Sequence, residues 1–416
     1  MRSDPVADRL SLKINAALDR LAGDMPRVGI ALSGGGDSTA LLHLAHGWAA
    51  GRKLMAATVD HGLRAESASE ARLAHAAATA LGIAHETLAW RRQGQGGNLM
   101  AQARDARLRL LAEWAHRHGL SAVLLGHTQD DQAETLLMRL ARGAGVDGLA
   151  GMAEARRAQD MIWLRPMLTI SRADLRDWLR VRRIGWIDDP SNENEDYDRV
   201  RIRKALAALD LPLAQLAQSA TNLATARDAL QDFADQVAQG TFAHLGSLGL
   251  PLAAFRRAPP EIRRRLLVAG LRFVTGADYP PRRETLLRAI SVLNTGGRVT
   301  LDGVIAQAAD THLRLIREPA AAARHGANAD GSQVLWDNRW QIQGVEPGLD
   351  IRALGYDAMP DWDWRASGLS RDEAAATPAV LRDGKILAAP VLKPHARISA
   401  TPLRDLHHFR AFIYTH

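Results

Sequence analysis

The first half of the chain alternates short apolar runs with longer amphipathic segments. The short runs predict strands, and they span residues 27–32, 54–59, 83–88 and 122–126. The segments between them are rich in Ala, Leu and Arg, and they predict helices near 38–50, 66–81, 100–118 and 130–142. Strands and helices that alternate in this way form a parallel sheet covered by helices on both faces. The pattern therefore predicts an α/β fold.

The pattern changes after Pro166, which breaks the apolar run before a helix that begins near Ser171. A long Ala/Gln/Leu-rich segment predicts a linking helix over 212–239, and helical patterns continue to about residue 318. The segment 317–333 is rich in Ala, Gly and Asn and is typical of a linker. The tail mixes short β-like runs with turns. We expect three domains: a parallel-sheet domain over 1–211, the linking helix and a helical domain over 212–325, and a small mixed α/β domain over 326–416.

The composition excludes several classes of protein. The chain has 416 residues and no cysteine, which excludes disulfides, thiolate metal sites, iron–sulfur clusters and a cysteine nucleophile. Its apolar runs are far shorter than the roughly 20 residues of a membrane span. The first residues carry early acids and no apolar block, unlike a secretory signal. We expect a cytoplasmic protein without a membrane partner.

Positive charge is concentrated in one part of the chain. The net charge is +7, and 48 of the 53 basic residues are arginines. Residues 255–288 carry nine arginines against three acids, whereas basic and acidic residues cancel from 332 to the end. Such a segment is either a solvated helix face or a surface for a polyanion. Within it, Arg263 and Arg264 belong to the densest cluster, and they are our candidates for contact with that polyanion.

A glycine-rich stretch follows the first predicted strand. It reads SGGGDS and runs from Ser33 to Ser38. Ligands bind at the carboxyl ends of strands in an open parallel sheet, and a helix N-terminus favours an anion there. The stretch lacks the spacing and the lysine of a Walker loop. A plain strand-to-helix turn, with Asp37 as the cap, is the structural alternative.

The complete string resembles the S-G-G-x-D-S motif of the PP-loop ATP pyrophosphatases, which cleave ATP to AMP and pyrophosphate. The resemblance implies that the loop cradles the phosphates of ATP and that Asp37 holds Mg²⁺. The residues it assigns to the nucleotide are Ser33, Gly34, Gly35, Gly36, Asp37 and Ser38.

Four further stretches carry candidate residues. Asp60 and His61 follow the second strand, Arg104 and Arg107 lie one turn apart on a predicted helix, and Asp131 and Glu134 open another. An i, i+3 spacing puts the last two carboxylates on one face, where they suit a cationic amine or a metal. A basic helix later in the chain carries Arg199, Arg201 and Arg203. Taken singly, each has a structural reading as a cap or a surface charge.

Together these stretches, in their order and spacing over about 26–205, resemble the bacterial tRNA(Ile)-lysidine synthetases. The resemblance implies that ATP adenylates the wobble cytidine of the isoleucine tRNA with a CAU anticodon. The ε-amine of L-lysine then displaces AMP, and lysidine forms.

The resemblance also implies roles for single residues. Asp37, Arg104, Asp131 and Glu134 are catalytic, and Asp37 and Asp131 hold the metal. Asp60 and His61 belong to the nucleotide site. Lysine or tRNA is bound by Asp131, Glu134, Arg107, Arg199, Arg201, Arg203, Arg263 and Arg264. The middle and C-terminal domains are expected to bind tRNA, and no obligate protein partner is implied.

Three alternatives remain at this stage. A tRNA thiolase of the same superfamily is disfavoured because such enzymes generally use cysteines. A small-molecule amide-forming ATP pyrophosphatase explains the glycine loop but not the basic middle segment. A catalytically inactive RNA-binding adaptor would keep the nucleotide fold alone. Incorporation of labelled lysine into tRNA distinguishes these classes.

Overall fold

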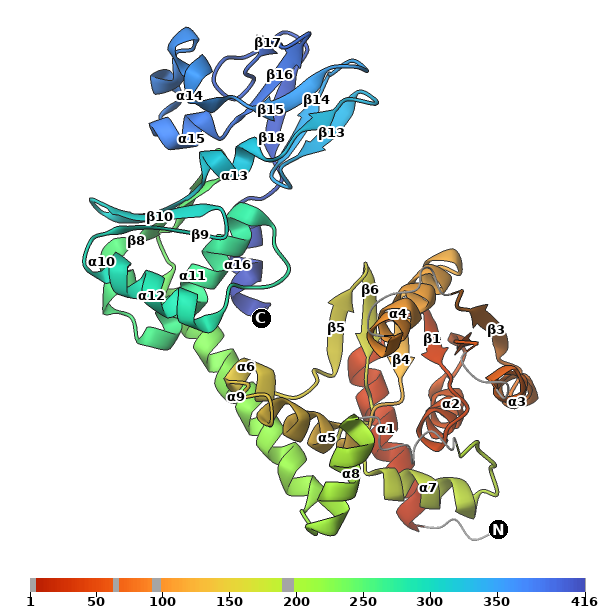
Figure 1. Cartoon of the computed structure of the whole chain (residues 1–416). Helices are drawn as coiled ribbons and strands as arrows, with labels where there is room; N and C mark the ends of the chain where they lie inside the picture. The colour runs from red at the N-terminus through yellow and green to blue at the C-terminus, as the bar shows by residue number, and fades with distance from the viewer. Residues whose placement is uncertain (1–4, 63–66, 92–98, 189–197, 416) are drawn as a thin grey trace. The chain divides into compact units, whose positions relative to one another are not determined.

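The chain is described by a computed structural model over residues 5–62, 67–91, 99–188 and 198–415 (Figure 1). It divides into two compact units, Met1–Ala226 and Arg227–His416. The long helix α9 (Leu213–Val237) confirms the expected linking helix and runs from the first unit into the second. Within the described ranges, no helix is both long and apolar enough to cross a membrane.

The first unit is built on one six-stranded sheet in the order β3-β2-β1-β4-β6-β5. All neighbouring strands are parallel except the edge strand β5, which pairs antiparallel with β6. The four predicted strands are confirmed within about one residue at each end. The β5–β6 hairpin was not predicted, because β5 has the polar sequence ARRA. The strands are β1 (Arg27–Ala31), β2 (Lys53–Asp60), β3 (Ala84–Ala89), β4 (Ala122–Leu125), β5 (Ala155–Ala158) and β6 (Met161–Leu164).

Helices cover both faces of this sheet, as the alternating pattern predicts (Figure 1). On one face α1, α2 and α7 share an apolar core with the strands, and α4 buries Trp114 in a second core on the other face. The helices of this unit before α9 are α1 (Pro5–Ala22), α2 (Gly36–Trp48), α3 (Ser67–Ala80), α4 (Leu99–Arg117), α5 (Gln129–Leu140), α6 (Val146–Leu149), α7 (Arg172–Val181) and α8 (Asp198–Ala208).

The second unit begins with helices packed against a five-stranded antiparallel sheet, in the order β7-β8-β11-β10-β9. The helices were expected, but the sheet was not. Its strands are short and joined by tight turns, such as Asp302-Gly303 with both residues at positive φ. The elements are β7 (Phe242–His244), β8 (Ser247–Pro251), α10 (Leu252–Arg257), α11 (Pro260–Thr275), α12 (Arg283–Asn294), β9 (Arg298–Leu301), β10 (Val304–Ala309) and β11 (His312–Arg317).

The rest of the second unit is mixed α/β, as expected, with separate apolar clusters of its own. In the final helix, Phe409 and Ile413 pack into the core of α11 and β8. The elements are α13 (Pro319–Ala323), β12 (Ala327–Asn328), β13 (Gln333–Trp336), β14 (Trp340–Gln343), β15 (Asp350–Ala353), α14 (Gly355–Ala358), η2 (Met359–Asp361), η3 (Trp364–Ser367), α15 (Arg371–Ala375), β16 (Pro378–Arg382), β17 (Lys385–Ala388), β18 (Ser399–Pro402) and α16 (Leu406–Tyr414).

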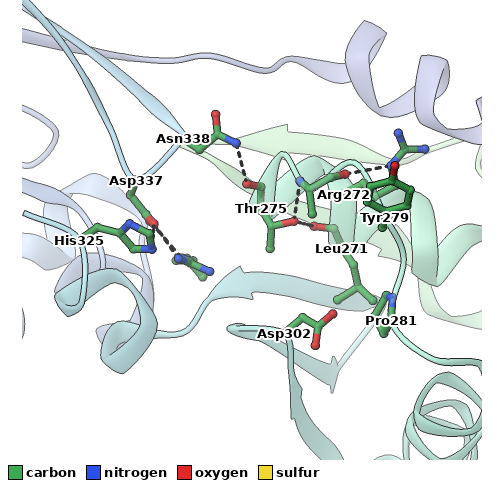
Figure 2. A pocket seen from close by; sticks show the side chains of 11 residues that line it. Leu271, Arg272, Thr275, Tyr279, Pro281, Asp302, His325, Asp337 and Asn338 are labelled. Atoms are coloured by element: carbon green, nitrogen blue, oxygen red, sulfur yellow. Dashed lines mark hydrogen bonds and ion pairs between the residues drawn. The ribbon is translucent and has the colours of Figure 1, made fainter. Parts of the chain in front are cut away.

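A cavity of about 250 Å³ lies in this unit where the end of α11 meets the β13–β14 turn (Figure 2). The buried Asp337 on its wall accepts two hydrogen bonds from Arg317 and one from Arg339. Asn338 donates across the cavity mouth to the Thr275 carbonyl at 3.3 Å. The ion pairs of Asp337 compensate its buried charge. Together with the Asn338 hydrogen bond, they join the part of the unit that ends with β11 to the part that follows it.

Candidate active site

The glycine loop joins β1 to α2 at the carboxyl edge of the parallel sheet. Gly34 adopts φ = +85°, and a side chain there would come within 2.6 Å of the Ile187 Cδ1 atom. The Gly34 carbonyl also accepts hydrogen bonds from the Ile187 N–H at 2.9 Å and the Thr39 hydroxyl at 3.1 Å. Glycine is therefore required at this position, both for its conformation and for space.

The two serines hold the loop closed. The Ser38 hydroxyl donates to the Gly35 carbonyl at 3.0 Å, accepts from the Ser33 N–H at 3.2 Å and lies 3.0 Å from the Ser33 hydroxyl. Gly126, after β4, allows a second close approach, since a Cβ there would lie 3.1 Å from the Ser38 backbone. The loop is fixed in shape by its serines and by the segments packed against it, as an anion cradle at a helix N-terminus requires.

Asp60 and His61 lie at the same edge of the sheet, at and just after the end of the neighbouring strand β2. The Asp60 carboxylate accepts a hydrogen bond from the Gly62 N–H at 2.9 Å. His61 is half-buried against Trp90, edge to face, with ring centroids 5.8 Å apart. Burial lowers the pKa of His61, and the nearby charge of Arg107 lowers it further. His61 is therefore a neutral ring at pH 7.

An arginine that the sequence analysis did not select joins three of the predicted carboxylates. The Arg172 Nε atom donates to Asp37 at 3.0 Å, Nη1 to Glu134 at 3.3 Å and Nη2 to Asp131 at 3.4 Å. The Arg172 backbone N–H donates to Asp130 at 2.7 Å. Asp37, Asp131 and Glu134 are thus brought together as expected, with Asp130 beside them.

Helix α8 adds two more arginines to this cluster. Arg199 and Arg203, four residues apart, reach Glu134 with N–O distances of 3.0 and 2.9 Å. Arg201, on another face of α8, pairs with the exposed Asp198 instead. The structure therefore brings Arg199 and Arg203 to the site, and it does not bring Arg201 there.

The environment of the carboxylates sets their charge. Burial raises the pKa of Asp37, and Arg172 offsets part of that effect. Burial also opposes ionisation of Asp131, but Arg172, Arg199 and the Thr128 N–H outweigh it and hold the pKa of Asp131 below its usual range. Asp37 also has one buried oxygen, Oδ1, without a hydrogen-bond partner among the described residues. That free oxygen fits a metal ligand.

Arg104 and Arg107 are solvent-exposed on α4. A histidine lies near the same edge of the sheet: His127 follows β4 and accepts a hydrogen bond from the Arg165 Nε atom at 3.2 Å. Burial lowers the pKa of His127 to about 4, although the Asp131 charge opposes this and Arg165 and Arg107 add to it. His127 was missed in the sequence and belongs to the same edge of the sheet.

Arg263 and Arg264 belong to the second unit, on α11. Arg264 donates twice to Glu261, at 2.9 and 2.7 Å, and only 14% of its side chain is exposed. The next residue, Arg265, is completely buried. Arg256 and Arg257 on α10, by contrast, are exposed. Within this basic cluster, the structure therefore buries Arg265 and pairs Arg264 with an acid, so these two side chains are not freely exposed.

A simple rule would have selected the missed residues. Side chains that follow the carboxyl end of a parallel strand gather at one edge, and Arg165 and Arg172 both follow β6. Arg165 and Arg172 do not stand out in the sequence because its pattern does not predict β6 as a strand. The Ser171 cap did locate the start of α7, since its hydroxyl accepts from the Asp174 N–H at 3.1 Å.

Comparison with known proteins agrees with this geometry. A family model described as a PP-loop domain matches residues 8–209. The tRNA(Ile)-lysidine synthase of Ruegeria pomeroyi is 43% identical over 374 residues, which cover 88% of each chain. That of Wolbachia pipientis is 34% identical over 76% of each chain, and that of Bradyrhizobium diazoefficiens is 35% identical over 79% of this chain and 99% of the relative. With this similarity along most of its length, and with a PP-loop beside clustered carboxylates, the chain belongs to the tRNA(Ile)-lysidine synthase family.

Proposed function

We propose that the protein is a ligase that joins L-lysine to the wobble cytidine of the isoleucine tRNA with a CAU anticodon. In the proposed reaction, the cytidine 2-carbonyl oxygen attacks the α-phosphate of ATP, and pyrophosphate leaves. The lysine ε-amine then attacks cytidine C2, AMP leaves, and lysidine is formed. The observation that carries the proposal is the cluster of Asp37, Asp131 and Glu134 around Arg172, beside the glycine loop.

The loop and its neighbours are proposed to bind ATP. The backbone of Ser33 to Gly36 and the Ser38 hydroxyl would hold the phosphates, and Asp60 and His61, at and just after the end of β2, would lie beside them. The free Asp37 Oδ1 atom supports an Mg²⁺ site, with Asp131 as the second carboxylate. Mg²⁺ commonly binds to one or two carboxylates together with substrate phosphates, and there it neutralises charge on the leaving group.

The carboxylates of α5 are proposed to bind the amine. Glu134 is 1% exposed and lines a cavity together with Asp130, whereas Asp131 is bonded to Thr128 at 2.8 and 2.9 Å. The position of Glu134 in the cavity wall favours it as the group that orients the ε-amine or accepts its proton, and Asp131 is proposed for the metal together with Asp37.

The exposed arginines are proposed to bind tRNA. Arg104 and Arg107 on α4 would face the anticodon nucleotide, and Arg104 would stabilise charge in the transition state. In the second unit, Arg263 and Arg264 remain candidates, but the exposed Arg256 offers a freer contact to phosphate. All these substrates are cytoplasmic, and we propose the same compartment for the enzyme.

The proposal is tested by incubating the protein with ATP, Mg²⁺, labelled L-lysine and total bacterial tRNA. We expect label in tRNA, release of AMP and pyrophosphate, and dependence on all three substrates. Release of AMP without tRNA would instead indicate a small-molecule ligase, and no release at all would indicate an RNA-binding adaptor. Either result would contradict the proposal.

A further inference from the structure

One face of α7 is lined with arginines. Arg172, Arg176 and Arg180 follow one another at intervals of four residues, so they lie in a row along the helix. All three line a cavity of about 670 Å³ in the first unit. Arg172 stands at the catalytic end of this row, since it is bonded to Asp37 and Glu134.

The cavity has two kinds of wall. Its charged wall contains α7 and the carboxylates of Asp130 and Glu134. Its other wall, from α8 and the residues that follow it, is largely apolar and includes Leu206, Leu211 and Leu213. A cavity with two carboxylates at one end, an apolar wall and a row of arginines suits a ligand with an ammonium group, a methylene chain and a carboxylate.

The three arginines differ in how fully they are bonded. Arg172 binds three carboxylates, and Arg180 binds the Asp177 carboxylate at 2.6 Å. Arg176 has one long contact, 3.5 Å from its Nη2 atom to the mostly exposed Asp188. Its Nε atom is buried and has no hydrogen-bond partner among the residues that the structure describes. Arg176 is therefore the member of the row that is ready to bind an anion.

We propose that Arg176 binds the α-carboxylate of the L-lysine substrate, whose ε-amine lies at Glu134. Four helical residues advance about 6 Å along the axis, roughly the reach of an extended four-carbon side chain. With the amine at the Arg172 end of the row, the carboxylate falls one turn further along, at Arg176. The leucines of the opposite wall then cover the methylenes. This inference rests on the proposed function.

A tRNA phosphate is the competing occupant of Arg176, and the cavity lining disfavours it. Four acids line the cavity, which are Asp130, Glu134, Asp177 and Asp210, and they balance its four arginines. A phosphodiester would meet repulsion from the acids and would gain little from the leucine wall. L-lysine carries two ammonium groups and one carboxylate, so its ammonium groups are attracted by the acids and its methylenes pack against the leucines.

The test compares L-lysine with cadaverine, which has the same amine and chain but no carboxylate. In the full-length protein we expect Arg176→Gln to raise the KM for L-lysine roughly tenfold to a hundredfold, as loss of a charged hydrogen bond does. The KM for cadaverine, the KM for tRNA and kcat should change less than about threefold. The control is Arg183→Gln at the exposed turn that follows the same helix, which should leave the lysine KM unchanged.

Each outcome decides one point. Equal rises in KM for L-lysine and cadaverine, or no rise for either, would overturn the assignment. A rise in the KM for tRNA alone would indicate a phosphate site. Arg176→Lys should recover part of the lysine affinity because it keeps the charge, and an unchanged circular dichroism melt excludes loss of folding. If the wild-type protein fails to attach lysine to tRNA, the proposed function fails, and this inference fails with it for a different reason.

Discussion

At the scale of single residues, the positive charge of Arg172 offsets the negative charge of the three carboxylates in the site. Asp37, Asp131 and Glu134 all lie within 3.4 Å of its guanidinium, and carboxylates so close together repel one another when ionised. The guanidinium is planar and permanently charged, and its separate N–H groups face the three acids at once. A lysine at this position would present one point charge and could not bridge them in the same way.

Asp37 is the residue whose loss should affect chemistry most directly. We predict that Asp37→Asn lowers kcat for lysine incorporation by at least about a hundredfold, because the amide cannot supply the negative charge proposed for Mg²⁺. Side-chain size and the Arg172 neighbour remain, so circular dichroism should not change. Initial rates with labelled lysine check this, with the exposed Asp24→Asn as the control. A variant within threefold of the wild-type rate would contradict the metal assignment.

At the scale of elements, a series of side-chain contacts on β2, β3 and α3 runs from the protein surface to Leu32, just before the glycine loop. The Thr58 hydroxyl donates to the Leu32 carbonyl at 2.7 Å, so it accepts from the His85 Nε2 atom at 2.8 Å. On its other side, the His85 Nδ1 atom lies 3.2 Å from the Nδ1 atom of His75 on α3. In this chain of contacts His85 carries a hydrogen on Nε2, and its Nδ1 atom faces another imidazole rather than a carboxylate.

The pKa of His85 lies far below the ordinary value of a histidine. Burial lowers it to about 4, and the charge of His75 contributes, while Glu86 opposes both. The unfolded chain takes up this proton below about pH 6.5, whereas the folded protein takes it up only near pH 4. The contribution to stability is thus complete above pH 6.5, and it is lost as the pH falls from 6.5 to 4.

Histidine NMR at a series of pH values checks this prediction. We expect His85 to titrate near pH 4, and His75→Gln to raise that midpoint while leaving it below 6.5, because burial remains. Urea unfolding of the wild type should give a midpoint that declines between pH 6.5 and 4. A His85 midpoint near 6.5 would show that the ring is not held neutral.

At the scale of the whole molecule, the second unit is held together by buried ion pairs between its two sets of elements. Arg317 at the end of β11 and Asp337 in the β13–β14 turn are 8% exposed and 6% exposed, and they share two hydrogen bonds. Arg314 and Arg298 make further pairs, with Glu373 and Asp372. The middle and C-terminal segments of this unit therefore contact each other through ion pairs. They are also joined by α16, which packs into the apolar core of the middle segment.

Removing Asp337 should destabilise this unit strongly. We predict that Asp337→Ala costs about 3–5 kcal/mol, because it leaves the charges of Arg317 and Arg339 buried and unpaired. The control is Glu346→Gln, which breaks an exposed pair with Arg382 and should cost less than about 1 kcal/mol. Urea unfolding followed by circular dichroism measures both. Equal costs for the two variants would mean that the buried network contributes little.

The sequence by itself determined the parallel-sheet fold and most of the residues at its ligand edge. Local pattern was sufficient there, because strand length, helical period and the SGGGDS string are all properties of neighbouring residues. Asp37, Asp131 and Glu134 were found for the same reason, since each directly follows a strand or opens a helix. The glycine loop could be assigned without any knowledge of distant contacts.

Only the tertiary structure decided which charges meet. Arg172 is 135 residues from Asp37 along the chain and bonds to it through folding alone. Likewise, the sequence makes Arg264, Arg265 and Arg256 equivalent members of one basic cluster, and packing separates them. Arg265 is buried, Arg264 is bonded to Glu261, and Arg256 is exposed. The physical reason is that the energy of a charge depends on its burial and its partners, and both are set by segments far away in sequence.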